Sequence, residues 1–436
     1  MAEIGRAAAL PRGGTAPDTR GPSTDLGLDM KALAASIAVA LLVSLPLRAE
    51  DVWNEQRAVP DEAGANAQFG AAASLDGSLA LFGADGEDSF KGAAYFYTKG
   101  AGGWTELQRI TPDDTTAAEF GYRVLLRGDL AIVTADQSSP NNNTAQGSAY
   151  VFAPDNTGTW LQTQILLADD GQTFDNFGST ASMDGNTLVI GAHGATVGPN
   201  AAQGAAYLFA NHSGNFSQSG KVVADDGVAF DNFGITTAIV GDTLFVGAAT
   251  AQIGSNFGQG AVYAYHLDNG TWTQQQKLVA DDGASGDNFG LSLAFDGTTL
   301  MVGSIFSGGT GAVYVFTNDG TGWQQQQRLS VDGISQYSFF GNAIALHDGE
   351  ALIGADGQNV GADTTVGAAY LFRFDGASWV QAHTFLSSDG TTDDFFGLAV
   401  DYDGSTALIS TLHPNGNQGA AYFYTHDTIF TDGFDG

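Results

Sequence analysis

The dipeptide Phe-Gly recurs along this chain at a nearly constant interval, and this repetition limits the folds that the sequence can adopt. Its seven copies, 51 to 57 residues apart, are Phe69-Gly70, Phe120-Gly121, Phe177-Gly178, Phe233-Gly234, Phe289-Gly290, Phe340-Gly341 and Phe396-Gly397. Such periods are typical of proteins in which each repeat packs on its neighbours. We therefore expect one repeat architecture, although the length of 436 residues alone would suggest two or three domains.

Each repeat contains four short apolar segments separated by turn residues. Examples are FGLSLAF, LMVGS and GAVYVF, followed by a run with Trp and Gln such as TWTQQQKLV. The alternation Tyr-x-Phe and the abundance of Val, Ile, Phe and Tyr indicate strands. The sequence therefore predicts an all-β fold, a seven-bladed β-propeller of four-stranded antiparallel blades.

The seventh repeat ends at Tyr424 without the fourth segment, and a matching segment stands near the other end of the chain. Residues 51–59 read DVWNEQRAV, in which Trp53 aligns with the Trp of TWTQQQKLV. We predict that this segment pairs with residues 419–424, so that the mature N-terminal strand closes the last blade and no sheet edge is left open.

Residues 30–49 have the pattern of a secretory signal peptide. Lys31 precedes an apolar run of 14 residues, from Ala32 to Leu45, and Ala49 ends a suitable cleavage site. We expect residues 1–29 to be an upstream segment with a mis-assigned start, residues 50–425 to be the propeller and residues 426–436 to be a short acidic tail. The alternative is a buried core helix at 32–45. Export near Ala49 would make the protein secreted, periplasmic or attached to the cell surface.

The charge of the chain restricts its partners. The formal net charge is −33 and there is no cysteine. Nucleic acid and anionic membrane surfaces are therefore unexpected partners, whereas a cation or a basic protein is favoured. Stability must come from packing rather than from disulfides.

These repeats resemble the FG-GAP repeat family, which includes the propeller heads of integrin α chains and secreted bacterial repeat proteins. The resemblance rests on Phe-Gly, on Val-Gly-Ala or Ile-Gly-Ala after the second strand, and on Gly-x-x-Tyr-x-Phe in the third, and it covers nearly all of residues 51–425. It implies a binding or adhesion module for a protein or carbohydrate ligand. We expect the mature chain itself to be a monomer without a transmembrane span.

The calcium loops of integrin-type repeats do not transfer to this sequence. Those loops lie between the first and second strands, where this chain has short turns such as Asp184-Gly185 and Asp296-Gly297. One or two carboxylates cannot supply the six to eight oxygens that calcium prefers. Arg127-Gly128-Asp129 occupies the same turn position, and we interpret it as an ordinary hairpin.

A second acidic string, A-D-D-G-x-x-x-D-N-F-G, connects consecutive blades at 168–178, 224–234 and 280–290. Strand order places all blade-to-blade connections at one end of the propeller, together with the loops between second and third strands. Over half of the acidic residues of the mature chain fall there. Asp and Gly favour turns, whereas three carboxylates in one loop could also bind calcium. The candidate calcium ligands are Asp169, Asp170, Asp175, Asp225, Asp226, Asp231, Asp281, Asp282 and Asp287.

Catalytic motifs are missing from the sequence. It contains no G-x-S-x-G, no H-E-x-x-H and no phosphate-binding loop, and His193 and His413 stand singly in loops. We therefore expect a protein that is not an enzyme. Two alternatives stay open: a carbohydrate-active lyase or glycosidase that uses the acidic end, and a purely structural repeat protein.

Overall fold

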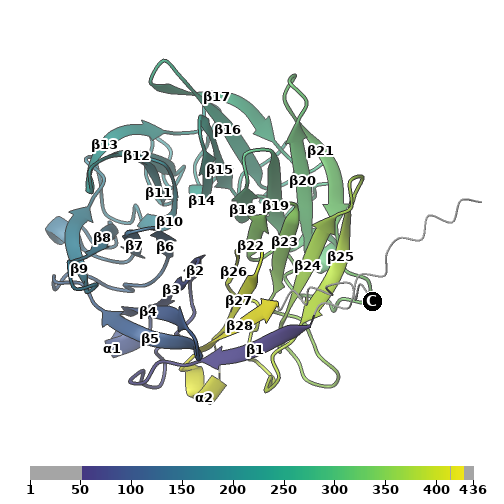
Figure 1. Ribbon diagram of the computed structural model, residues 1–436. Helices are drawn as coiled ribbons and strands as arrows, with labels where there is room; N and C mark the ends of the chain where they lie inside the picture. The colour runs from purple at the N-terminus through teal and green to yellow at the C-terminus, as the bar shows by residue number, and fades with distance from the viewer. Residues whose placement is uncertain (1–51, 413, 427–436) are drawn as a thin grey trace, which may run out of the picture. The chain divides into compact units, whose positions relative to one another are not determined.

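The computed structural model describes residues 52–412 and 414–426, in which 28 strands form seven four-stranded antiparallel sheets. Figure 1 shows these sheets as the blades of a ring. In six blades the four strands follow one another in chain order, and the first strand lies toward the central channel. The predicted seven-bladed propeller is therefore confirmed.

The blades are numbered here in chain order. The strands of blades 1 to 4 are β2 (Ala73–Asp76), β3 (Leu79–Ala84), β4 (Ala93–Gly100), β5 (Gly103–Ile110), β6 (Val124–Arg127), β7 (Leu130–Ala135), β8 (Ser148–Pro154), β9 (Trp160–Leu166), β10 (Phe177–Asp184), β11 (Thr187–Ala192), β12 (Ala205–His212), β13 (Asn215–Val222), β14 (Phe233–Val240), β15 (Thr243–Ala248), β16 (Ala261–Asp268) and β17 (Thr271–Leu278). Those of blades 5 to 7 are β18 (Ser292–Phe295), β19 (Thr299–Ser304), β20 (Ala312–Asn318), β21 (Trp323–Leu329), β22 (Ile344–His347), β23 (Glu350–Ala355), β24 (Ala368–Phe374), β25 (Trp379–Phe385), β26 (Val400–Tyr402), β27 (Thr406–Thr411), β28 (Ala420–His426) and β1 (Trp53–Ala58). The short helical turns are α1 (Glu87–Phe90), η1 (Pro140–Asn142), η2 (Ser307–Gly309) and α2 (Pro414–Asn417).

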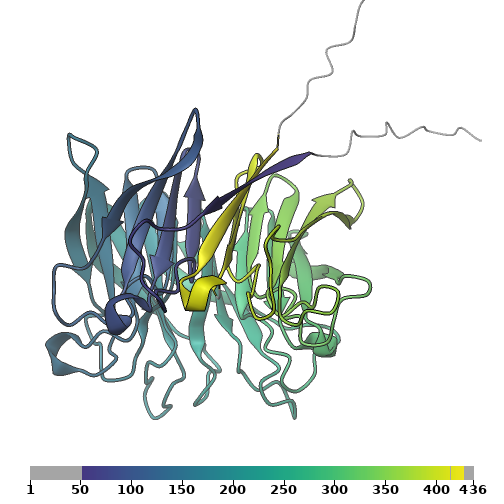
Figure 2. The ribbon, with the colours of Figure 1, turned by 90° about the horizontal axis from the view of Figure 1, so that it is seen from below.

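Blade 7 is built from both ends of the described chain. Strand β1 pairs antiparallel with β28 over six residues, from Trp53 opposite His426 to Ala58 opposite Ala421. The Trp53 ring packs edge-on against Phe385 of blade 6, with ring centroids 5.0 Å apart. The predicted closure by the N-terminal strand is confirmed, and it links the two ends of the ring (Figures 1 and 2).

The two glycine motifs of the repeat meet at the contact between blades. A Cβ atom on Gly247 of the second strand of blade 4 would lie 2.2 Å from the carbonyl oxygen of Gly290, in the Phe-Gly of blade 5. The corresponding distance between Gly191 and Gly234 is 1.9 Å. Real Cβ atoms do not approach so closely, so the motifs recur because neighbouring backbones touch at these points.

The aromatic residues of the repeat fill the spaces within and between blades. Each Phe of Phe-Gly is fully buried, and Phe233 packs edge-on against Tyr263 of the third strand with ring centroids 5.5 Å apart. Trp104 and Trp160, in fourth strands, are 3% exposed. These two rings stack on Phe423 and Phe96 with centroids 4.2 and 4.3 Å apart, so they belong to the packed core.

The hairpin interpretation of Arg127-Gly128-Asp129 is also confirmed, since Arg127 ends β6 and pairs with Leu130 of β7. Residues 1–51, 413 and 427–436 lie outside the described residues, which leaves the signal peptide, its cleavage near Ala49, His413 and most of the acidic tail as predictions. Within the described part of the chain, no helix has the length and apolar character needed to cross a membrane.

Candidate binding face at the loop end

The two ends of the propeller differ in construction. One end, the hairpin face, carries the tight turns between first and second strands and between third and fourth strands. The other end, the loop face, carries the blade-to-blade connections and the loops between second and third strands; α1 and α2 lie at this end in Figure 2. The turns of the hairpin face between first and second strands hold two or three residues, as between Asp184 and Thr187. They are too short to form an integrin-type calcium loop.

Each blade-to-blade connection is fixed to the preceding blade by backbone hydrogen bonds. In the connection into blade 4, the N–H groups of Phe230, Asn232 and Phe233 donate to the carbonyl oxygens of residues 201, 202 and 203 at 2.9, 3.2 and 2.9 Å. Phe230 and Asn232 adopt left-handed backbone angles, with φ of 69° and 56°. The repeated acidic string is therefore a joint that locks each blade to its neighbour.

The third aspartate of each string closes the turn of this joint. Asp175, Asp231 and Asp287 are buried, and each Oδ2 accepts the N–H of the residue three positions earlier at 2.8 Å. Burial raises the pKa of Asp175 and of Asp231. These carboxylates therefore do what turn chemistry predicts, capping backbone N–H groups.

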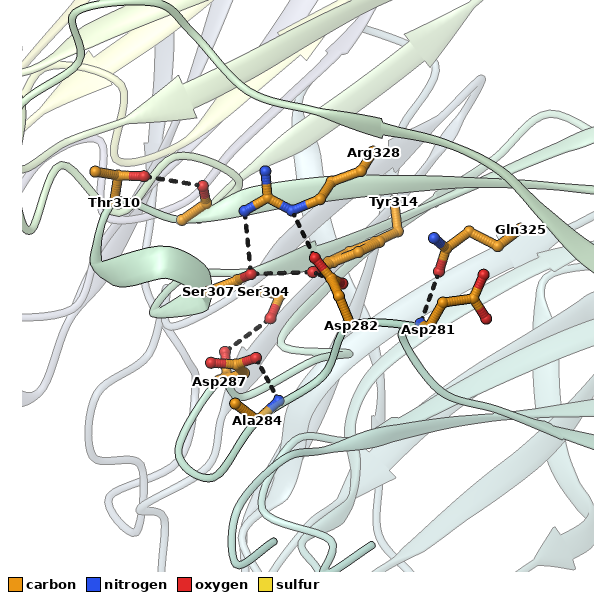
Figure 3. A network of polar contacts seen from close by, with 11 residues as sticks. Asp281, Asp282, Ala284, Asp287, Ser304, Ser307, Thr310, Tyr314, Gln325 and Arg328 are labelled. Atoms are coloured by element: carbon orange, nitrogen blue, oxygen red, sulfur yellow. Dashed lines mark hydrogen bonds and ion pairs between the residues drawn. The ribbon is translucent and has the colours of Figure 1, made fainter.

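The second aspartate of each string binds a tyrosine and a basic residue of the blade that follows. Asp282 accepts the hydroxyl of Tyr314 at 2.7 Å and lies 3.2 Å from Nε of Arg328, as Figure 3 shows. Asp170 contacts Tyr207 and Lys221, and Asp226 contacts Tyr263 and Lys277, at 2.8 to 2.9 Å.

The lysine and tyrosine partners lower the pKa of Asp170 and of Asp226. Burial raises the pKa of Asp170 and of Asp226, but hydrogen bonds from lysine and tyrosine outweigh burial, so both values fall below the usual one. The charge of the second aspartate is therefore compensated within the protein.

The first aspartate of each string points its charge to solvent. The backbone N–H groups of Asp169, Asp225 and Asp281 donate to glutamine Oε1 atoms of fourth strands at 3.0 to 3.1 Å, and their side chains are exposed. The three aspartates of one string thus have separate partners. Among residues 52–412 and 414–426, no group of three His, Cys, Asp or Glu side chains is placed to hold a metal ion. These contacts favour the turn interpretation, and calcium binding stays an untested prediction.

Buried titratable groups lie at the loop-face ends of second strands, and one of them, Asp356, lines the central channel. Asp85, Asp136 and Asp356 directly follow second strands, and burial raises the pKa of the first two to about 6 and of Asp356 to about 7. Burial also lowers the pKa of His193. Arg123 is the one basic side chain among the described residues that line the channel.

Exposed aromatic residues on the loop face were missed by sequence reasoning. Phe174, Phe230 and Tyr337 stand three residues before Phe-Gly and are 61, 67 and 65% exposed. Phe257 and Phe306, in neighbouring loops, are 71 and 41% exposed. The residue type three positions before Phe-Gly varies between repeats, and this variation was the available signal. The other repeats have Asn66, Ala117, Gly286 and Asp393 there. The sequence-based prediction rested on the residues that recur in every repeat and passed over the loop residues that differ between repeats.

Comparison with known proteins identifies the repeat. The family model described as FG-GAP repeat matches residues 104–152, 160–209, 216–265, 272–316, 323–372 and 379–424, more than half of the chain. One curated relative, integrin alpha-3 of Cricetulus griseus, is 26% identical over 234 residues, which cover 51% of this chain and 22% of that protein. The match therefore spans less than a quarter of the relative's length.

Proposed function

Because the chain belongs to the FG-GAP repeat family, we propose that it is an exported binding and adhesion module that holds a protein ligand on its loop face. The similarity to an integrin α chain supports a binding role, since both share the repeat. The fold alone hosts many functions, so the location of the site has to be argued from its residues.

The exposed aromatics Phe174, Phe230 and Tyr337 carry this proposal. Their φ angles are 65°, 69° and 60°, a left-handed conformation that costs a bulky residue about 1 kcal/mol or more. The same position holds Asn66, with φ of 65°, and Gly286, residue types that tolerate such angles. Six of the seven repeats adopt the left-handed conformation at this position, but only three of them with an aromatic side chain. The conformation therefore does not depend on the rings, and exposed rings at such a cost are typical of a binding surface.

The charge of the same face indicates what kind of partner it holds. Asp169, Asp225 and Asp281 present exposed carboxylates in the connections that lead into blades 3, 4 and 5. Phe174 and Phe230 belong to the first two of these connections. A partner surface with Lys or Arg could place its cations on both the rings and the carboxylates. We expect its association rate to fall as salt increases.

The triple variant F174N/F230N/Y337N tests this function. Biolayer interferometry would compare it with the wild-type chain on a panel of purified extracellular-matrix proteins and on immobilised cells. We expect the wild type to bind at least one of these surfaces and the variant to lose tenfold or more in affinity. Its melting temperature should stay equal or rise, because asparagine accepts left-handed angles more readily than phenylalanine or tyrosine.

A variant of the hairpin face is the matched control. D129A changes the Arg-Gly-Asp tripeptide at an exposed turn and should bind as the wild type does. The proposal fails if the wild type binds nothing on the panel, or if D129A loses binding while the triple variant keeps it.

Calcium dependence of this binding is a separate prediction of the sequence. If Asp169, Asp170 and Asp175 and their equivalents bind calcium, millimolar calcium should raise the melting temperature over that measured with a chelator. An unchanged melting temperature would reject the calcium interpretation and leave the turn interpretation.

A further inference from the structure

A groove opens on the hairpin face between blades 5 and 6. It has a volume of about 570 Å³, within the range of small-molecule sites. Its floor includes Val315 of β20, and its far wall is formed by Phe374 and Trp379 of blade 6. A smaller, repeat-related groove of about 300 Å³ lies between blades 4 and 5.

The wall of blade 6 provides an exposed aromatic ring. Phe374 is the last residue of β24 and is 49% exposed, and its ring centroid lies 5.7 Å from that of the buried Trp379. The residues that occupy this strand position in blades 1 to 5 are Lys99, Pro154, Asn211, Leu267 and Asn318. The propeller therefore tolerates many side chains here, and the exposed ring is particular to this groove.

The wall of blade 5 provides uncharged polar groups. It consists of the hydroxyls of Thr298, Thr299 and Thr317 and the amides of Asn318 and Gln326. The amide of Gln327 is already occupied, because it donates to the carbonyl oxygen of Trp379 and accepts its N–H, both at 2.8 Å.

Charge is nearly absent from the groove. None of the described residues that line it is Lys or Arg. Its one carboxylate, Asp296, is exposed at the rim, and its Oδ1 accepts N–H groups of Thr298 and Thr299 at 2.8 and 2.7 Å. The hydroxyl of Thr298 donates to Asp296, Oδ1 of Asn318 accepts the N–H of Gly320, and Nε2 of Gln326 donates to the carbonyl oxygen of Gln324. An anionic ligand would lack a cation here, and a purely apolar ligand would cover the hydroxyls of Thr299 and Thr317 without offering them a partner.

We propose that this groove is a binding site for a neutral saccharide. A pyranose ring has an apolar face that fits against Phe374 and hydroxyl edges that can bond the hydroxyl of Thr317, Nδ2 of Asn318 and Oε1 of Gln326. The site lies at the opposite end from the loop face, so it does not depend on the protein-binding function proposed above.

The variant F374N tests the site with little risk to the fold, because asparagine already occupies this position in blades 3 and 5. Saturation-transfer NMR and calorimetry would use maltose, cellobiose, laminaribiose and chitobiose at millimolar concentration. We expect the wild type to bind at least one of these disaccharides, and F374N to bind it at least tenfold more weakly with an unchanged melting temperature.

A loop-face variant and an acidic sugar are the controls. F230N should bind the disaccharide as the wild type does, and a digalacturonate should not bind. The proposal is overturned if none of the four disaccharides binds, if F374N binds as tightly as the wild type, or if the acidic sugar binds in the same groove as well as the neutral one.

Discussion

The three aspartates of the repeated acidic string differ in their hydrogen-bond partners and in their exposure to solvent. Asp175 caps a backbone N–H, Asp170 is compensated by Tyr207 and Lys221, and Asp169 is exposed to solvent. The sequence left turn chemistry and calcium binding both open for this string, and the hydrogen bonds of the third aspartate agree with turn chemistry. The sequence alone could not show which aspartate has which role, because the roles of the first two depend on side chains of the following blade.

Asp356 allows a test of burial at the level of one residue. Burial raises its pKa from 3.8 to about 7, so its protonated form stabilises the fold at acid pH, and this contribution is lost as pH rises from about 4 to about 7. We expect D356N, which mimics the neutral acid, to unfold with a free energy roughly 2–4 kcal/mol higher than the wild type at pH 8 and nearly equal at pH 4. Urea unfolding at both pH values measures the difference.

The exposed hairpin residue Asp129 gives the matched control, because D129N removes a carboxylate from the surface and should not raise the free energy of unfolding at pH 8. A D356N variant that is less stable than the wild type at pH 8 would show that the charged carboxylate of Asp356 is stabilising, contrary to this account.

The strands were easier to predict from the sequence than the loop conformations or the contacts between blades. The four-segment repeat and the missing segment after Tyr424 led to the seven blades and to the pairing of β1 with β28, because burial imposes the same apolar pattern on every blade. The exposed rings of Phe174 and Phe230 were missed, since nothing in a phenylalanine signals a left-handed backbone or exposure. The groove beside Phe374 was missed because it forms only when two blades pack together.

Deletion of residues 50–59 tests closure by β1. The deletion removes the outer strand of blade 7 and exposes the edge of β28, which should lower the melting temperature by roughly 10 °C or more. Gln56 also links β1 to blade 1, exchanging hydrogen bonds with the backbone of Trp104 at 2.7 and 2.8 Å, and this clasp would be lost as well.

Truncation after His426 is the control for this deletion, since it removes none of the strands described here. Differential scanning calorimetry would compare both truncations with the whole chain. Equal melting temperatures for the whole chain and for the chain without residues 50–59 would show that β1 does not close the ring.

At the scale of the whole molecule, ring closure leaves two ends with different chemistry on one rigid scaffold. The loop face combines exposed carboxylates with the rings of Phe174, Phe230 and Tyr337, whereas the hairpin face carries the neutral groove beside Phe374. The residues that recur in every repeat form the scaffold, whereas residues found in only some repeats, such as Phe174 and Phe374, form the two surfaces. A binding module of this kind can therefore change its ligand through loop residues without a change of fold.

The footprint of a bound protein ligand tests the central claim most directly. Hydrogen–deuterium exchange would be measured on the wild-type chain with and without the matrix protein that it binds. We predict that protection concentrates in residues 172–176, 228–232 and 335–339 of the loop face. Protection confined to hairpin turns such as 184–187 and 240–243, with these loops unchanged, would contradict the account.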